Sequence, residues 1–288
     1  MSRPTPRGAR FPASLPGTSG SRAGAAPPVP PGRGAATGAP GPSPMLRPQR
    51  PLQHAADEAA RRVMPSGLGL DSATVRARMV ERLRREGIDS VPVLQAFGEV
   101  ERHRFVDSAL ATQAYEDISL PIGHGQTISK PSVVARMLQL LFDGDSARSS
   151  GTLGRVLEIG TGCGYQTALL SLLSRGVLSI ERLAPLHEKA RANLHGWRRG
   201  DVRLVHGDGR LGHASWGPYD SIVAAAGGDD LPPAWPEQLA PGGRLVAPVH
   251  DAQAGSQVLL VVDRLTQGGF RQQRVGSVHF VPLKSGKA

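Results

Sequence analysis

The sequence predicts an α/β protein with a doubly wound, mostly parallel sheet of seven strands, helices that precede the sheet, and an antiparallel edge at its C-terminal end. Three observations support this prediction. Short apolar segments alternate with helical ones from residue 155 onward, a glycine-rich turn follows the first apolar segment, and a turn sequence joins the last two. Strands separated by helices are typical of parallel sheets, because each parallel connection needs a crossover.

Three helices are expected before the first strand of this sheet. The first spans residues 71–86 and stops at Gly87, with apolar residues four positions apart on its buried face. The second follows Ser90 and carries Pro92 in its first turn, where a proline removes no helical hydrogen bond. The third spans residues 130–142 and has a strongly apolar face. The first part of the folded chain is therefore helical.

The stretch LPIGHGQTIS, residues 120–129, interrupts this helical region. Gly123 and Gly125 lie close together in it, and few of its apolar positions are paired. We expect neither a helix nor a strand here, but an irregular loop directly before the third helix.

Seven strands and the helices between them account for the rest of the chain. Helices are expected at 164–175 and 184–196. The expected strands are RVLEIG (155–160), GVLSIE (176–181), VRLVHG (202–207), YDSIVAAA (219–226), GRLVAPV (243–249), QVLLVVDRL (257–265) and RQQRVGSVHFVPL (271–283). The last two flank TQGG, which predicts a hairpin and hence the antiparallel edge.

Composition divides the chain near residue 65. Residues 1–65 contain 14 of the 25 prolines, nine arginines and only two acidic residues. Such a segment cannot bury enough apolar surface to offset the entropy of ordering it, so we expect disorder. Residues 66–288 are expected to form one folded domain, with a helical subregion at 66–150 and the sheet at 151–288.

The N-terminal extension also carries most of the positive charge. Its net charge is +7 of the chain's +10, which leaves about +3 for the remaining 223 residues. A basic arm can bind nucleic acid through its charge, but no aromatic residues alternate with these arginines. We therefore expect no nucleic-acid partner except through this extension.

The rest of the composition predicts a cytoplasmic protein. Prolines and arginines interrupt every N-terminal apolar stretch that a secretory signal would need, and no apolar run is long enough to cross a bilayer. Cys163 is the only cysteine, which excludes an internal disulfide and a cysteine-based metal cluster. We expect no membrane association and no bound metal.

The turn LEIGTGCGYQT places Gly160, Gly162 and Gly164 between the first strand and its helix. Glycines there let the backbone approach a ligand closely at the switch point of the sheet. The spacing departs from the G-x-G-x-x-G pattern of dinucleotide sites, because Tyr165 stands in place of the third glycine. Glu158 precedes the turn, and its charge would repel a pyrophosphate and attract a cation.

Two further carboxylates follow later strands. Glu181 ends the second strand, 21 residues after Gly160, where a carboxylate can accept hydrogen bonds from both hydroxyls of a ribose. Asp208 follows the third strand in HGDGR, on the expected adenine side of the same crevice. Each of the three acids alone could be an ion-pair partner, a helix-leading acid or a turn former. Together they favour a crevice for S-adenosylmethionine, a nucleoside with an ammonium, a sulfonium and no phosphate.

Seven blocks of the sequence, in order within residues 70–284, carry a more specific resemblance. They are RHRFV, QAYEDISLPIGHGQTISKP, VLEIGTGCGYQTALL, GDGR, YDSIVAAA, EQLAPGGRLVAPV and VHFVPL. In these blocks the chain resembles the protein-L-isoaspartate O-methyltransferase family, which belongs to the class I S-adenosylmethionine-dependent methyltransferases. The glycine turn is typical of methyltransferases in general, whereas the GQTIS block is specific. The resemblance implies a Rossmann-like methyltransferase domain, with the substrate site in 66–150 and the cofactor-binding sheet in 151–288.

The resemblance also implies roles for individual residues. The implied active-site residues are Ser129 and Thr127. The implied substrate-groove residues are Ile128, His279 and Val281. The implied cofactor-binding residues are Glu158, Gly160, Gly162, Gly164, Glu181, Asp208 and Gly209. Ser129 also precedes a helical pattern, where serine is a preferred cap, so a capping role stays open beside the active-site role.

The implied reaction is a protein repair step. The methyl group of S-adenosylmethionine moves to the free α-carboxylate of an L-isoaspartyl residue in a damaged protein or peptide, leaving S-adenosylhomocysteine. A carboxyl of this kind has a pKa of roughly 3.5, so it needs no general base at neutral pH. His124 and His279 are therefore expected to be structural or groove-lining. We expect a monomer that acts on isoaspartyl proteins and peptides.

Two departures from the family pattern and two alternative functions accompany this interpretation. Cys163 stands where serine is frequent, and AAAGGDDLP lacks the proline usual near Gly227. The family also suggests an unusual order of the last strands, which the sequence does not determine. The alternatives are a class I methyltransferase that acts on a small molecule or RNA, and a non-catalytic nucleoside-binding module with a basic arm.

Overall fold

The computed structural model describes residues 73–197, 201–253 and 255–288, which all belong to one compact unit. The extension at residues 1–65 lies outside the described residues. Its disorder and its role therefore stay predictions.

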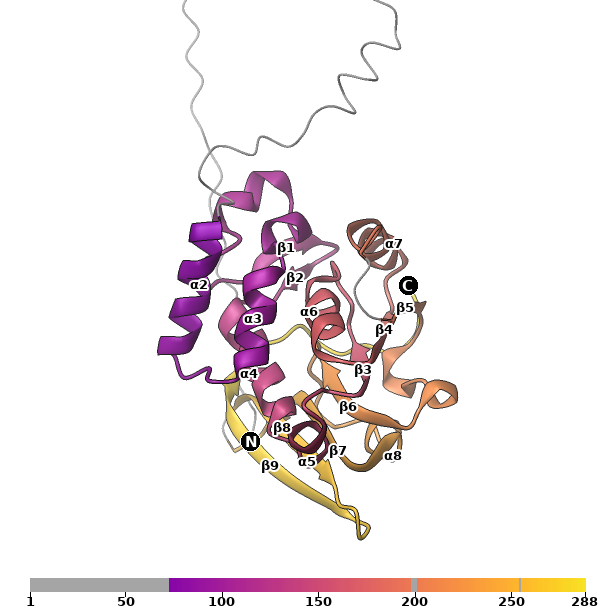
Figure 1. The fold of residues 1–288 in the computed structure, drawn as a ribbon. Helices are drawn as coiled ribbons and strands as arrows, with labels where there is room; N and C mark the ends of the chain where they lie inside the picture. Colours follow the sequence, from indigo (N-terminus) through magenta and orange to yellow (C-terminus); the bar gives the residue numbers. More distant parts are fainter. Residues whose placement is uncertain (1–72, 198–200, 254) are drawn as a thin grey trace, which may run out of the picture. The chain divides into compact units, whose positions relative to one another are not determined.

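A seven-stranded sheet forms the centre of this unit, in the order β5-β4-β3-β6-β7-β8-β9 (Figure 1). The strands are β3 (Arg155–Ile159), β4 (Gly176–Glu181), β5 (Asp201–His206), β6 (Tyr219–Ala224), β7 (Leu239–Asp251), β8 (Ser256–Arg264) and β9 (Phe270–Val278). Neighbouring strands from β5 to β7 pair in parallel, whereas β8 and β9 pair antiparallel. The predicted fold class is confirmed.

The antiparallel edge consists of two successive hairpins, so that β8 lies between β7 and β9. This arrangement settles the strand order that the sequence left open. The predicted TQGG turn joins β8 to β9, and Gly268 and Gly269 both have positive φ there, 97° and 81°. The last strand ends at Val278, five residues before the predicted end, and the following residues cross the strand ends instead.

The helices expected from the apolar patterns are present. They are α2 (Ala73–Arg85), α3 (Val91–Glu99), α4 (Pro131–Phe142), α6 (Tyr165–Leu173) and α7 (Ala184–Asn193). Shorter helices were not predicted: α5 (Asp145–Ser150), α8 (Ala234–Glu237), η1 (Arg102–Phe105), η2 (Ser108–Gln113), η3 (Gly209–Leu211) and η4 (Ala214–Trp216). A helix of one or two turns leaves too short an apolar period to be recognised.

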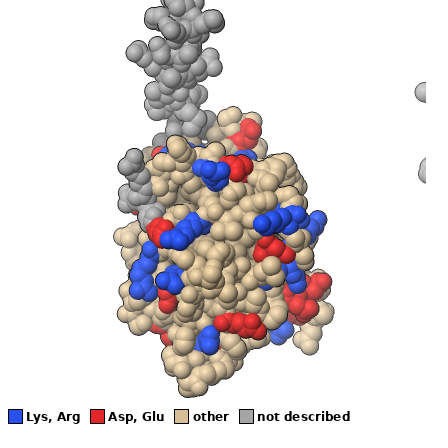
Figure 2. Space-filling model, turned by 90° about the vertical axis from the view of Figure 1, so that its right-hand side faces the viewer, with Lys and Arg blue, Asp and Glu red and all other residues tan. Residues whose placement is uncertain are grey.

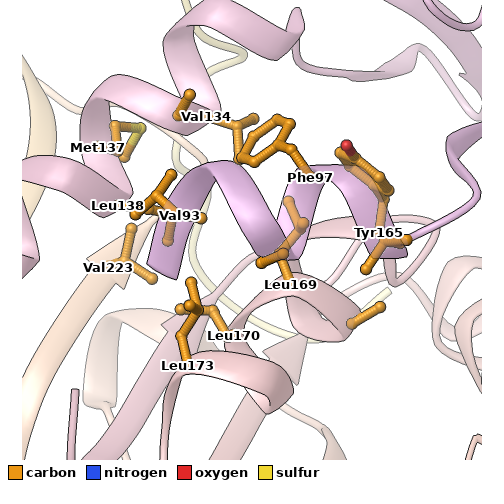
Figure 3. Close-up of a cluster of buried hydrophobic side chains, with 14 of the residues drawn as sticks. Val93, Phe97, Val134, Met137, Leu138, Tyr165, Leu169, Leu170, Leu173 and Val223 are labelled. Atoms are coloured by element: carbon orange, nitrogen blue, oxygen red, sulfur yellow. The ribbon is translucent and has the colours of Figure 1, made fainter. Parts of the chain in front are cut away.

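Two apolar layers cover the two faces of the sheet, because side chains alternate between faces along a strand. Val156 of β3 belongs to the layer that contains α3, α4 and α6, whereas its neighbour Leu157 belongs to the opposite layer. Figure 3 shows the first layer, where Val93 and Phe97 of α3 pack beside side chains of α4 and α6. The helices that precede the sheet are thereby fixed against the helix that follows the glycine turn.

The stretch at residues 120–129 contains a β-hairpin, so the expectation of an irregular loop was wrong. Strands β1 (Leu120–Gly123) and β2 (Gln126–Ile128) pair antiparallel and are joined by two residues, His124 and Gly125. Both have positive φ, 55° and 68°, as a tight two-residue hairpin turn requires. Of the two glycines that argued against a strand, Gly123 ends β1 and Gly125 lies in the turn.

One face of the described part of the molecule carries interspersed charges of both signs (Figure 2). Figure 2 shows lysine and arginine side chains beside aspartate and glutamate side chains over one face. This pattern agrees with the small net charge expected outside the N-terminal extension. Among the described residues, no helix combines the length and the apolar character needed to cross a membrane.

Candidate active site

A cavity of about 250 Å³ lies at the carboxyl ends of β3, β4 and β6. Open parallel sheets bind ligands at this edge, where the strand order reverses, and here it reverses between β3 and β6. Two parts of the cavity lining matter most. We call the lining residues within 122–129 of the hairpin the hairpin wall, and those within 159–166 and 180–183 the sheet wall. Residues 281–284 close a third side.

The two walls touch at the glycine turn. Gly162 has φ 57°, and a Cβ added to it would lie 3.2 Å from Cδ1 of Ile122 in β1. Lys189 of α7 donates from Nζ to the carbonyl of Ile122 at 2.9 Å. The hairpin therefore sits directly on the turn and is tied to the helix beyond it. Gly164, by contrast, does not line the cavity and packs against Leu194.

Glu181 is the only acidic residue among the described residues that line the cavity. Its Oε2 accepts the N–H of Gly162 at 2.9 Å and its Oε1 accepts the N–H of Leu183 at 2.9 Å. Each carboxylate oxygen keeps a lone pair for a second donor. The side chain is thus held in place at the strand end and can still accept hydrogen bonds from a ligand.

Glu158 lies behind the sheet wall and does not reach the cavity surface. It is fully buried, and its carboxyl group accepts hydrogen bonds from Nε2 of Gln166 at 3.1 Å and Oγ1 of Thr167 at 2.5 Å. Burial raises the pKa of Glu158 to about 7, and the hydrogen bonds only partly oppose that rise. Gln166 lines the cavity, so Glu158 contacts the site through that side chain.

Asp208 and Gly209 follow β5, as the sequence predicted. Gly209 lines the cavity, and a Cβ there would lie 2.6 Å from Cγ2 of Ile159, so glycine is required by packing. Asp208 is not part of the lining. Its Oδ1 accepts the N–H of Arg210 at 2.9 Å and its Oδ2 accepts the N–H of Gly286 at 2.6 Å. The described structure thus gives both Asp208 oxygens protein donors.

Thr127, Ile128 and Ser129 all line the cavity from the hairpin wall. Thr127 is exposed, Ser129 is half-buried and Ile128 is buried. Ser129 is not the cap of α4: the cap residue is Lys130, without a side-chain cap bond, and Asp117 accepts the N–H of Ser132 at 2.8 Å. The Ser129 hydroxyl is therefore not committed to the helix start.

Residues 281–283 cross the strand ends beside Gly227. The N–H of Gly227 donates to the carbonyl of Val281 at 2.9 Å, and the N–H of Leu283 donates back to Gly227 at 2.6 Å. A proline at position 227 would lack the first donor, which gives the departure at this position a physical consequence. Val281 lines the cavity, whereas His279 is exposed and lies outside the lining.

Three residues of the site region were missed by the sequence analysis. Tyr165 and Gln166 line the cavity from the start of α6, and Arg102 is fully buried with Nη2 donating to the carbonyl of Ser129 at 2.8 Å. Tyr165 was noticed only because it breaks a glycine pattern. Arg102 stands in the RHRFV block, but no spacing rule marks an arginine before a loop as buried.

A metal centre finds no support in the part of the chain that the structure describes. Nowhere in residues 73–197, 201–253 and 255–288 do three or more histidine, cysteine, aspartate or glutamate side chains gather in a group that could hold an ion. Cys163 is buried, and burial raises the pKa of its thiol, so it has the character of a packing residue.

Comparison with known proteins agrees with this geometry. The family model described as protein-L-isoaspartate(D-aspartate) O-methyltransferase matches residues 74–288. A protein-L-isoaspartate O-methyltransferase of Methylibium petroleiphilum is 58% identical over 246 residues, which cover 85% of this chain and 90% of the relative. One of Leptothrix cholodnii is 60% identical over 241 residues, covering 83% and 84%.

Two solved structures are similar as well. One, a protein-L-isoaspartate O-methyltransferase, has a TM-score of 0.64 and 27% identity, over 73% of this chain and 66% of the other. The second is a putative protein-L-isoaspartate O-methyltransferase from Plasmodium falciparum in complex with S-adenosyl-L-homocysteine. It has a TM-score of 0.62 and 24% identity, over 73% of this chain and 98% of the other, and it supports the fold.

Proposed function

The chain belongs to the protein-L-isoaspartate(D-aspartate) O-methyltransferase family, and from this premise we propose how its residues divide the work. It is an S-adenosylmethionine-dependent enzyme that methylates the free α-carboxylate of L-isoaspartyl residues in damaged proteins and peptides. The observation that carries the proposal is a shared cavity, lined by Glu181 at a strand end and by Ser129 at the end of the hairpin.

The sheet wall is the proposed cofactor side. Glu181 would accept the ribose hydroxyls of S-adenosylmethionine, because its two oxygens are fixed by backbone donors and keep free lone pairs. Gly160, Gly162 and Gly209 leave the wall without side chains, so a ligand can approach the backbone. When bound, the cofactor supplies a methyl group activated by a sulfonium.

Three predicted cofactor residues act from behind this wall in our proposal. Glu158 would orient Gln166 through the hydrogen bond that its carboxyl group accepts. Asp208 would reach the adenine side only if it shares or releases the N–H of Gly286. Gly164 serves the packing of α6 against α7.

The hairpin wall is the proposed substrate side. The hydroxyls of Ser129 and Thr127 would donate to the substrate carboxylate and orient one oxygen toward the methyl group. The carboxylate is already ionised at neutral pH, so neither hydroxyl removes a proton and neither forms a covalent bond. Ile128 and Val281 would contact the peptide, whereas His279, which is exposed outside the lining, would contact only a longer substrate.

The apolar residues in the walls of the cavity also limit the access of bulk water to the site. Ile122, Ile159 and Ile180 line it together with the polar residues. An anion and a cation become two neutral products in this reaction, so a site that excludes bulk water favours the transition state over the separated charges. Holding the reacting atoms about 3 to 3.5 Å apart would contribute much of the remaining acceleration.

The wider organisation follows from the same proposal. The methyltransferase domain spans residues 66–288, with the substrate site in 66–150 and the cofactor-binding sheet in 151–288. Residues 1–65 are an extension outside the catalytic domain. The enzyme would act as a monomer on isoaspartyl proteins and peptides in the cytoplasm, without a metal, a membrane or a nucleic acid.

Transfer of a labelled methyl group tests the proposed substrate. The enzyme should methylate a peptide with one L-isoaspartyl residue and leave the matched L-aspartyl peptide unlabelled. Labelling of RNA or of a small molecule in place of the isoaspartyl peptide would favour another class I methyltransferase. Cofactor binding without transfer to the isoaspartyl peptide, with salt-sensitive nucleic-acid binding lost on deletion of residues 1–65, would favour a binding module.

A further inference from the structure

Arg102 is a buried arginine that links three parts of the substrate side. Its side chain is 0% exposed, and Nε donates to the carbonyl of Ala114 at 2.8 Å. Its Nη2 donates to the carbonyl of Ser129 at 2.8 Å, and its guanidinium carbon lies 4.7 Å from the ring centre of Tyr165. Ser129 and Tyr165 both line the cavity, so Arg102 forms the layer directly behind them.

The charge of Arg102 has no counter-ion within the described residues. None of their carboxylates lies within ion-pair distance, and the nearby Asp117 is bound to Ser132 and Lys130 instead. Nη1 of Arg102 and the hydroxyl of Tyr165 are both buried, and neither has a hydrogen-bond partner among the described residues. Burial lowers the pKa of Arg102, yet arginine keeps its proton in proteins.

A partly buried arginine shows the usual solution. The side chain of Arg244 is 13% exposed, and its guanidinium binds both oxygens of Asp263, at 2.5 and 3.0 Å. A buried cation without such a partner is costly, because it has lost its hydration and gained no opposite charge. Arg102 therefore has the properties of a group whose anion arrives from outside.

The proposed reaction brings two carboxylates into the cavity. The one assigned to the hairpin wall is the α-carboxylate of the substrate, and the other belongs to the methionine part of the cofactor. We propose that Arg102 is a substrate-positioning residue, which fixes the Ser129 backbone and provides the positive charge that compensates the α-carboxylate as it leaves water. The inference rests on the proposed function. It adds a positive charge behind the neutral hydroxyls of Ser129 and Thr127, in a cavity whose own cationic lining residues, Arg182 and Lys284, lie outside the hairpin wall.

The substrate carboxylate loses its negative charge during the reaction, and this determines whether KM or kcat depends more on Arg102. Methyl transfer turns the carboxylate into a neutral ester, so the attraction to Arg102 weakens as the reaction proceeds. The charge therefore stabilises bound substrate more than the transition state and acts chiefly on KM. The ester product loses this attraction, which favours its release.

A thermodynamic cycle tests the proposal by combining a change in the peptide with a change at Arg102. Binding is measured by calorimetry on enzyme saturated with S-adenosylhomocysteine, for the isoaspartyl peptide and for the same peptide with its α-carboxylate replaced by a carboxamide. Wild type should bind the carboxylate peptide roughly 10- to 100-fold more tightly than the carboxamide. Arg102→Gln should weaken carboxylate binding by most of that factor, leave carboxamide binding within about threefold, and raise KM more than it lowers kcat.

Two further variants separate charge from structure. Arg102→Lys keeps the charge but, like Arg102→Gln, loses the guanidinium that binds the carbonyls of Ala114 and Ser129. It should therefore keep the preference for the carboxylate, and its loss of kcat should match that of Arg102→Gln. Arg76→Gln is the matched control: Arg76 also has a buried Nη1 without a hydrogen bond, but it lies 3.7 Å from Glu101. Its preference for the carboxylate should equal that of wild type.

Equal weakening of both peptides by Arg102→Gln would overturn the proposal, because a merely structural role predicts that result. If that variant does not fold, wild type still decides, since equal affinity for carboxylate and carboxamide contradicts any charge role. A wild-type enzyme that fails to methylate the isoaspartyl peptide refutes the proposed function instead. Methylation with an unchanged preference in Arg102→Gln refutes only the role of Arg102.

Discussion

The sheet wall and the hairpin wall face the same cavity but are built in different ways. Glu181 in the sheet wall and Glu158 behind it are both buried and held by backbone or side-chain donors. The hairpin wall presents an exposed hydroxyl in β2, that of Thr127, and a half-buried one just after it, that of Ser129. The difference indicates that the cofactor side is held by the core of the seven-stranded sheet, whereas the substrate side is formed by a separate hairpin that packs against that sheet.

The largest effect is expected from the sheet wall. Glu181→Gln removes the negative charge that would accept two ribose hydroxyls, so the dissociation constant for S-adenosylmethionine should rise roughly 100-fold. Calorimetric titration of the purified enzyme measures this constant. Glu188→Gln on α7 is the control, because Glu188 is exposed and bonded to Arg191. Equal cofactor affinity in both variants would remove Glu181 from the cofactor site.

The buried carboxyl behind the sheet wall should make stability depend on pH. The pKa of Glu158 is about 7 in the fold and about 4.5 ordinarily, so between these values only the unfolded chain loses the proton. The free energy of unfolding of cofactor-free enzyme should therefore fall by up to about 3 kcal/mol as pH rises through this window, and change little from this cause outside it.

Glu158→Gln should lack that part of the pH dependence. Urea unfolding at pH 4.5, 6 and 8 compares the variant with wild type. Parallel pH profiles for the two proteins would show that Glu158 is ionised in the fold, contrary to the proposed burial effect.

A substitution in the hairpin wall should lower turnover without changing the affinity for the cofactor. Ser129→Ala removes one hydrogen bond to a charged substrate group, so kcat/KM for an isoaspartyl peptide should fall roughly 10- to 100-fold at saturating cofactor. Ser149→Ala is the control, since Ser149 is exposed on α5. Unchanged turnover in Ser129→Ala would remove this hydroxyl from the substrate site.

The smallest effect is expected from the hairpin turn itself. Gly125 has φ 68° with open space around it, so Gly125→Ala introduces strain of about 1 kcal/mol and no clash. Turnover of the isoaspartyl peptide should fall about fivefold. Gly268→Ala also places an alanine at positive φ without a clash, in the turn between β8 and β9, and should leave turnover unchanged. Equal rates in both variants would show that the hairpin does not need this turn geometry.

The sequence predicted the sheet wall better than the hairpin wall, for a physical reason. Strands β3 and β4 are apolar runs, and Glu181 stands at a strand end, so its place at the edge of the sheet follows from the pattern. The hairpin was read as a loop, because its two glycines were counted against a strand. Positive φ at His124 and Gly125 shows that the turn chemistry was the stronger signal.

Contacts between residues far apart in the chain could not be predicted from local sequence patterns. Arg102 reaches Ser129 across 27 residues and Gly286 reaches Asp208 across 78, so neither partner can be inferred from spacing. Glu158 was expected at the ligand and lies behind Gln166 instead, because side chains of a central strand alternate between two covered faces.

The separation of the two walls is the central claim, and the cofactor dissociation constant of the Ser129→Ala and Glu181→Gln double variant tests it most directly. If the walls act independently, the double variant should bind S-adenosylmethionine as weakly as Glu181→Gln alone, and Ser129→Ala should bind it like wild type. A Ser129→Ala enzyme that binds the cofactor tenfold more weakly than wild type would contradict the account.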